Sequence, residues 1–147
     1  MSGGLNSSQS KDECVASCAK VKFNELYQDV AIEGWNSCLD TACDGYDTCQ
    51  AAALKSCELA DSYQDFARAK CQQELDCGDV DNLDGCIAGM NDPNKDTMGS
   101  YACYSSSAFE GMIECIKVRN CKSPSENTAY LTCMGDLFGI EIKAAGE

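Results

Sequence analysis

The sequence predicts an all-α protein: a disulfide-stapled bundle of about five helices, built from antiparallel helical hairpins. The chain of 147 residues contains 13 cysteines, which is close to the content of about 8–10% that marks a disulfide scaffold. Apolar residues recur at helical spacing, and no segment alternates as a β-strand does. Large aliphatic residues are few and the net charge is −13, so cross-links of about 2–4 kcal/mol each must substitute for a large core. We expect a polar tail over residues 1–10 and a single disulfide-rich domain over residues 11–147.

The first predicted helix covers residues from about 11 to 39. Within it, Phe23, Leu26 and Val30 recur near helical spacing. A second predicted helix covers about 48–75, where alanine and cysteine share one broad face. Such a face allows a neighbouring helix to approach closely.

Three further helices are predicted in the C-terminal half. A short one covers 82–90 and ends at the loop 91–96, which contains Asn, Asp and Pro. The fourth covers about 98–118. The last covers about 125–144, and it begins with a sequence typical of an N-cap, Ser123-Pro124-Ser125-Glu126.

The cysteines form a degenerate threefold repeat. Each copy has two cysteines that bracket a predicted helix end, followed by a polar turn and a further cysteine on the next helix. The bracketing pairs are Cys38 and Cys43, Cys71 and Cys77, and Cys115 and Cys121. The following cysteines are Cys49 or Cys57, Cys86, and Cys133. This pattern predicts three helical hairpins.

The third copy allows a specific pairing to be predicted. Cys103 lies twelve residues before Cys115, and Cys133 lies twelve residues after Cys121. In an antiparallel hairpin these equal arms place Cys103 opposite Cys133 and Cys115 opposite Cys121. We expect disulfides at the residues that follow: Cys115, Cys121, Cys103, Cys133, Cys71, Cys77, Cys38 and Cys43.

The segment from Cys103 to Cys133 resembles the twin-cysteine hairpins of the coiled-coil-helix family, although its gaps are of eleven residues rather than that family's nine. The chain as a whole resembles the cysteine-rich, helix-repeat secreted proteins and lipoproteins of bacteria in its composition, not in a specific motif. The Gly/Ser-rich start also resembles the segment after the acylated cysteine of a bacterial lipoprotein. A lipid anchor of that kind would sit on an N-terminal cysteine that this chain does not contain.

Several kinds of chemistry are excluded or disfavoured by residue content. The chain has no histidine, which removes the commonest general base and the imidazole metal ligand. No Cys-x-x-Cys or phosphate-cradling glycine motif occurs. The negative charge disfavours nucleic acid, and no apolar run is long enough to span a membrane. We therefore expect no enzymatic activity and no cofactor or metal.

Two alternative functions stay open. A thiolate copper store would suit soft sulfur ligands, but only Cys14 and Cys18 have the i, i+4 spacing that a thiol-lined helix needs. A secreted carrier of a small apolar ligand is the other alternative. The intervals from Cys14 to Cys18 and from Cys77 to Cys86 resemble two intervals of insect odorant-binding proteins. The loop from Asp92 resembles the opening of a calcium loop but departs from it at the sixth and twelfth positions.

The leading prediction is an extracytoplasmic structural or interaction protein, a subunit of a surface or filamentous assembly whose partner is another protein or a further copy of itself. Disulfides persist in oxidising compartments, so we expect it to be secreted, at the cell surface or in the periplasm. Thirteen is odd, so one cysteine is left over. Cys14 is the candidate for the free or interchain thiol; in the alternative, Cys14 pairs within its chain and Cys49 is free.

Overall fold

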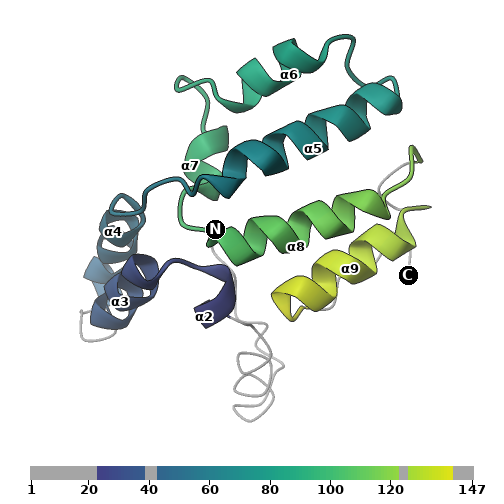
Figure 1. Ribbon diagram of the computed structural model, residues 1–147. Helices are drawn as coiled ribbons and strands as arrows, with labels where there is room; N and C mark the ends of the chain where they lie inside the picture. Colours follow the sequence, from purple (N-terminus) through teal and green to yellow (C-terminus); the bar gives the residue numbers. More distant parts are fainter. Residues whose placement is uncertain (1–22, 39–42, 123–125, 141–147) are drawn as a thin grey trace.

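The structure, a computed structural model, describes residues 23–38, 43–122 and 126–140 (Figure 1). The predicted all-α class is confirmed. The described residues form helices and no β-strand, apart from an isolated antiparallel bridge between Tyr27 and Tyr104. The helices are α2 (Phe23–Leu26), α3 (Asp29–Cys38), α4 (Cys43–Leu54), α5 (Ser62–Asp76), α6 (Leu83–Met90), α7 (Thr97–Tyr101), α8 (Ser106–Lys117) and α9 (Thr128–Phe138).

Three of the long predicted helices are interrupted, and this part of the prediction is wrong. The helix predicted over 11–39, which the structure describes over 23–38, is divided into α2 and α3 by residues 27–28. The helix predicted over 48–75 is replaced by α4 and α5, which are separated by residues 55–61. The helix predicted over 98–118 is replaced by α7 and α8, which are separated by residues 102–105. Each of the latter two interruptions contains a cysteine, Cys57 or Cys103.

The other predicted helices agree better with the structure. The short helix predicted over 82–90 is α6. The last helix, α9, begins at Thr128 and ends at Gly139, whose φ of 67° is the left-handed conformation that favours glycine. The predicted cap at Ser123-Pro124 lies outside the described residues, as do the tail and Cys14.

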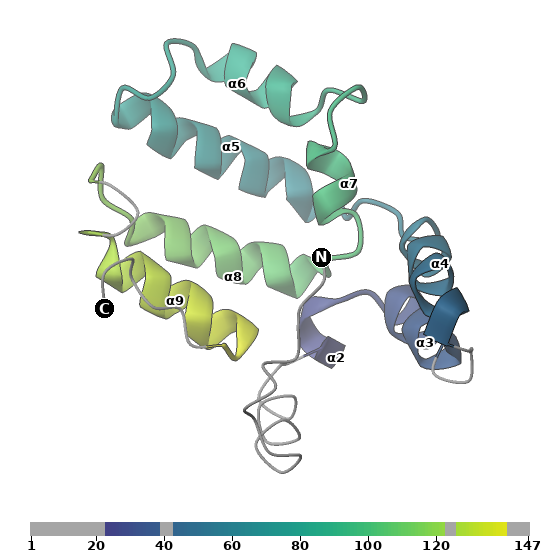
Figure 2. The ribbon, with the colours of Figure 1, turned by 180° about the vertical axis from the view of Figure 1, so that it is seen from behind.

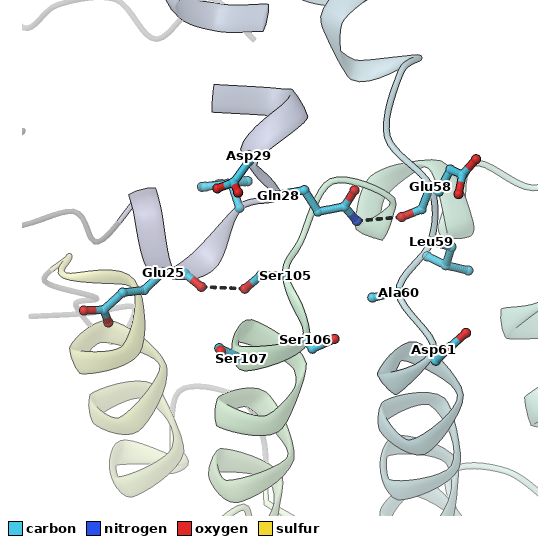
Figure 3. A pocket seen from close by; sticks show the side chains of 11 residues that line it. Glu25, Gln28, Asp29, Glu58, Leu59, Ala60, Asp61, Ser105, Ser106 and Ser107 are labelled. Carbon is cyan, nitrogen blue, oxygen red and sulfur yellow. Dashed lines mark hydrogen bonds between the residues drawn. The ribbon is translucent and has the colours of Figure 1, made fainter. Parts of the chain in front are cut away.

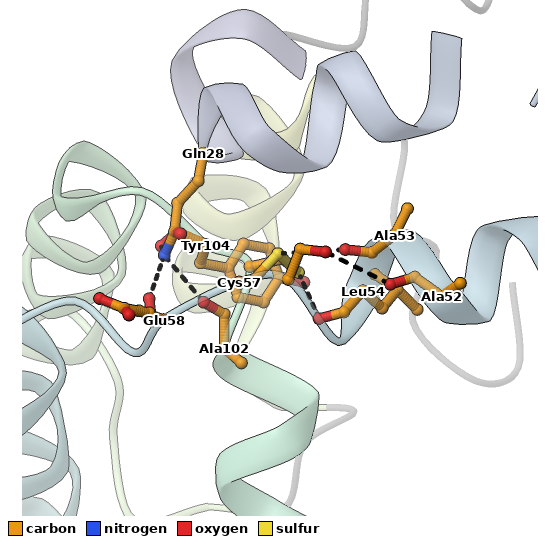
Figure 4. Close-up of a disulfide and its surroundings, with 10 residues drawn as sticks. Gln28, Ala52, Ala53, Leu54, Cys57, Glu58, Ala102 and Tyr104 are labelled. Carbon is orange, nitrogen blue, oxygen red and sulfur yellow. Dashed lines mark hydrogen bonds between the residues drawn. A yellow bond between two sulfur atoms is a disulfide. The ribbon is translucent and has the colours of Figure 1, made fainter. Parts of the chain in front are cut away.

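Gln28 contacts the interruptions at 55–61 and at 102–105 (Figure 4). Its side-chain Nε2 donates to the main-chain oxygens of Glu58, 2.6 Å away, and of Ala102, 2.8 Å away. Its main-chain nitrogen donates to the oxygen of Cys103 at 2.9 Å. Carbonyl groups that have no partner in a helix need another donor, and Gln28 supplies it in both segments.

The helices form three hairpins, which we number as repeats. Repeat 1 is α3–α4, repeat 2 is α5–α6 and repeat 3 is α8–α9. Figures 1 and 2 show four helices side by side in the order α6, α5, α8, α9, with repeat 1 to one side. α5 and α8 lie next to each other and run in the same direction, while α6 and α9 run back along their outer sides.

Aromatic side chains form the core between α5 and α8. Tyr63, Phe66 and Phe109 are buried, and the rings of Tyr63 and Phe109 meet edge to face at 5.6 Å. The Tyr63 hydroxyl donates to the main-chain oxygen of Met90 on α6 at 2.7 Å. A fully buried phenol therefore has its hydrogen bond, and it ties repeat 2 together.

Candidate functional site: disulfide framework and apolar groove

Three disulfides each close one repeat. In every case a cysteine on the first helix bonds a cysteine on the returning helix. The pairs are Cys38–Cys49 in repeat 1, Cys71–Cys86 in repeat 2 and Cys115–Cys133 in repeat 3. The first cysteine of each pair is at most 1% exposed.

A small residue lies one helical turn before the first cysteine of each pair. These residues are Gly34, Ala67 and Gly111. A Cβ on Gly34 would lie 2.6 Å from the Cβ of Ala53, and a Cβ on Gly111 would lie 2.5 Å from Cδ1 of Leu137. Ala53 and Leu137 each lie four residues after the second cysteine of their pair. Repeats 1 and 3 therefore share both a cross-link and a close helix approach one turn away, and repeat 2 shares the cross-link.

Two more disulfides join repeats 2 and 3. Cys57–Cys103 lies before the first residues of α5 and α8 (Figure 4), and Cys77–Cys121 lies after their last residues. Cys77 and Cys121 hold equivalent positions, six residues after Cys71 and Cys115, whereas Cys57 and Cys103 precede these residues by 14 and 12 positions. α5 and α8 are thus parallel neighbours with a disulfide at each end.

The pairings predicted from the sequence are wrong. Cys71 lies on α5 and Cys77 caps it, and six helical residues span about 9 Å, more than the roughly 7 Å between Cα atoms that a disulfide allows. Cys121 lies beyond the end of α8 and bonds Cys77, whereas Cys115 bonds Cys133 on α9. The predicted pair of Cys103 and Cys133 assumed an unbroken helix before Cys115, and the interruption at 102–105 removes that assumption.

The outcome for the individual cysteines is mixed. Seven of the eight residues predicted in disulfides are bonded, although to other partners. Cys43 begins α4, and its side chain lies outside the described part of the structure; Cys38 bonds Cys49 instead. Cys49 is therefore not the free thiol. The sequence does contain a signal for the hairpin bonds, which is the cysteine on each returning helix: Cys49, Cys86 or Cys133.

An open hollow of about 810 Å³ lies where α2 and α3 meet the start of α8 (Figure 3). We call it the acidic cleft, because four carboxylate residues, Glu25, Asp29, Glu58 and Asp61, surround it. Figure 3 shows the side chains of Glu25 and Glu58 pointing apart. The carboxylates do not converge on one point as the ligands of a cation would.

A second hollow, of about 250 Å³, lies along α8 between α5 and α9. We call it the apolar groove. Its deepest residues are Phe66, Met112 and Ile116, all buried. Most of its other lining is aromatic or sulfur-containing, and its two charged residues are both basic. The lining consists of Phe66, Lys70, Tyr101, Tyr104, Met112, Ile116, Arg119, Tyr130, Met134 and Phe138.

The phenols beside this groove resist ionisation. Burial raises the pKa of Tyr101, and the nearby phenol of Tyr130 raises it further. Burial also raises the pKa of Tyr104 to about 12, with smaller contributions from the neighbouring Tyr27. These hydroxyl groups therefore stay neutral hydrogen-bond donors at neutral pH.

One cluster of potential metal ligands occurs among the described residues, and it consists of Cys71, Glu74 and Cys86. Its two cysteines are bonded to each other, so neither is a thiolate. The calcium-like loop forms an Asx turn, in which the main-chain nitrogen of Asn94 donates to Asp92 at 2.9 Å. Neither arrangement provides a metal centre.

Comparison with known proteins gave no match: no family model, no curated protein and no solved structure is similar to this chain. The described helices include none that is long and apolar enough to cross a membrane. The five disulfides fit an oxidising compartment.

Proposed function

We propose that the protein is a structural subunit, secreted or at the cell surface, that joins a second copy of itself through repeat 1. The observation that carries this proposal is the bond between the equivalent residues Cys77 and Cys121 of repeats 2 and 3. Bonds between equivalent positions are what a twofold relationship produces. An approximate twofold axis parallel to α5 and α8 also exchanges α6 with α9, in agreement with the order of the helices in Figures 1 and 2.

Repeat 1 has no such counterpart among the residues that the structure describes. Cys43 follows the hairpin cysteine Cys38 by five residues, much as Cys77 and Cys121 follow theirs by six. Those two residues bond each other. A second copy of repeat 1 would supply the equivalent partner for Cys43, and the link would again join equivalent positions across a twofold axis.

The number of cysteines supports a link between chains. The five described bridges use ten of the 13 cysteines. Cys14, Cys18 and Cys43 are the other three, and an odd number cannot pair completely within one chain. Cys14 was the interchain candidate from the sequence, and its role stays a prediction because it lies outside the described residues. The repeat pattern favours Cys43.

Exposed apolar residues on repeat 1 agree with a contact surface. Val30 on α3 is 40% exposed and Leu54 on α4 is 45% exposed. The first helices of the other two repeats bury their apolar residues against each other, whereas α3 packs on α4 and α2. A second copy would cover part of this surface.

Non-reducing electrophoresis and intact mass of the oxidised protein test the proposal. We expect a dimer that reductant converts to monomer, and peptide mapping that identifies a bond from Cys43 to Cys43. Cys43→Ser should abolish the dimer while helical circular dichroism is retained. Cys14→Ser and Cys18→Ser are matched controls that should still dimerise.

Two results would contradict this proposal. One is a wild-type monomer in which Cys43 is bonded to Cys14 or Cys18. The other is a dimer that is lost in Cys14→Ser and kept in Cys43→Ser, which would instead support the prediction made from the sequence.

A further inference from the structure

The apolar groove combines an aromatic interior with positive charge. Phe66 and Met112 lie at its base, and Phe138 forms part of the wall contributed by α9. Flat and polarizable side chains of this kind favour contact with an aromatic ring. A volume of about 250 Å³ lies below the range of roughly 300–1,000 Å³ typical of sites for drug-sized molecules, so the occupant would be small, with one or two rings.

The two cations of the groove differ in how they are paired. Lys70 forms a salt bridge with Glu74. Arg119 lies over the ring of Tyr130, 5.7 Å from its centroid, and forms no salt bridge with a described carboxylate. The chain has 24 acidic and 11 basic residues. An arginine beside an aromatic groove that has no carboxylate partner among the described residues is available to an anion. A guanidinium group binds a carboxylate through two parallel hydrogen bonds.

We propose that the apolar groove binds a small aromatic carboxylate, with its ring against Phe66 and Met112 and its carboxylate on Arg119. Tyr101 and Tyr130 also line this groove, and each offers a hydroxyl group that can donate a hydrogen bond to a ligand. The acidic cleft is the opposite case, because its carboxylates would repel this ligand. The inference is independent of the assembly through repeat 1, since the groove is formed by α5, α7, α8, α9 and the residues that adjoin them.

The experiment uses 2-naphthoate as the probe, with naphthalen-2-ylmethylammonium as its cationic counterpart, and measures binding by calorimetry. We expect 2-naphthoate to bind and the cation to bind at least tenfold more weakly, as the loss of a charge-assisted contact predicts. Amide chemical shifts should change at residues of α8 and α9 that line the groove and not at the acidic cleft.

Two matched variants distinguish a contact inside the apolar groove from an effect of the net charge of the protein. Arg119→Gln removes the proposed partner of the carboxylate, and we expect it to weaken the binding of 2-naphthoate by about tenfold. Arg68→Gln makes the same change of charge at an exposed position on α5 outside the groove, and it should bind like the wild type. Equal losses in both variants, equal affinity for both probes, or no binding of 2-naphthoate at millimolar concentration would each overturn the proposal.

Discussion

Gly34 and Ala53 bring the backbones of α3 and α4 into close contact, because a Cβ on Gly34 would lie 2.6 Å from the Cβ of Ala53. The Cys38–Cys49 bond joins the same two helices one turn away, so they cannot separate to admit a methyl group. We expect Gly34→Ala to lower the free energy of unfolding. Overpacking costs about 1–3 kcal/mol, and the gain in helix propensity offsets at most about 1 kcal/mol of this.

Gly99→Ala is the matched control for that variant. No atom lies within 4 Å of a Cβ added to Gly99 on α7, so only the helix propensity changes and stability should be equal or higher. Chemical unfolding of both variants followed by circular dichroism gives the comparison. A Gly34→Ala protein as stable as the wild type would show that α3 and α4 are not in close contact.

The Cys77–Cys121 bond should be the first of the five described disulfides to be reduced. Each of the other four contains one cysteine that is less than 9% exposed, whereas neither Cys77 nor Cys121 is buried. Thiol–disulfide exchange requires that the attacking thiolate reach a sulfur atom. Partial reduction followed by alkylation and peptide mapping should therefore label these two residues before any other bonded pair.

A different order of labelling would contradict this prediction. If Cys71 and Cys86 were labelled first, burial would not control access in this fold. Reduction of Cys77–Cys121 alone should leave most of the helical circular dichroism intact. The hairpin bond that closes each of the three repeats would remain. A complete loss of helix at this step would show that the hairpin bonds do not hold the helices without Cys77–Cys121.

The buried side chain of Asn127 should be important for stability. It is 2% exposed, and its Oδ1 accepts a hydrogen bond from the main-chain nitrogen of Asn120 at 2.7 Å. Its Nδ2 donates to the main-chain oxygens of Asn120 and Lys122 at 3.2 and 2.9 Å. Because Asn127→Ala leaves these groups without partners, we expect a loss of about 2–4 kcal/mol in the free energy of unfolding.

Asn82→Ala provides the comparison for this variant. Asn82 is the exposed N-cap of α6, and its side chain accepts one hydrogen bond, from the nitrogen of Gly85 at 2.8 Å. Loss of such a cap costs about 1 kcal/mol. Denaturant unfolding should rank Asn127→Ala as the more harmful change. Equal effects of the two substitutions would mean that the loop after α8 does not depend on Asn127.

The sequence could predict those helices that are delimited by local signals. α6 lies between Asn82 and a loop that contains Asn, Asp and Pro, and these residues act on their immediate neighbours. The interruption at 55–61 has no comparable signal, since its residues include good helix formers. Its carbonyl group at Glu58 is instead satisfied by Gln28, 30 positions away in the sequence, and such a contact cannot be predicted from local periodicity.

The disulfides show the same limit. The threefold pattern of cysteines predicted three hairpins correctly, because it reflects the repeat itself. Pairing depends on which helices become neighbours, and nothing near Cys121 in the sequence indicates that α8 lies beside α5 and brings it to Cys77. For the same reason the apolar groove was not predicted, since its lining comes from α5, α7, α8 and α9 and is assembled only by the tertiary fold.

Tyr104 should make the protein less stable in alkali. Burial raises its pKa from 10.0 to about 12, and the adjacent Tyr27, whose ring stacks at 5.2 Å, adds to the shift. Between these two pH values the unfolded chain has lost the phenolic proton that the folded protein keeps. Because the unfolded state then binds fewer protons, stability is unaffected below pH 10 and falls as the pH rises toward about 12.

Denaturant midpoints measured across this pH range, with the tyrosinate absorbance recorded in parallel, test the prediction. Tyr104→Phe removes the titrating group and keeps the ring, so its stability should fall less steeply than that of the wild type. The stability of Tyr104→Phe should still depend on pH to some extent, because burial also raises the pKa of Tyr63 and Tyr101. Parallel curves for the two proteins would show that Tyr104 ionises as readily in the folded protein as in the unfolded chain.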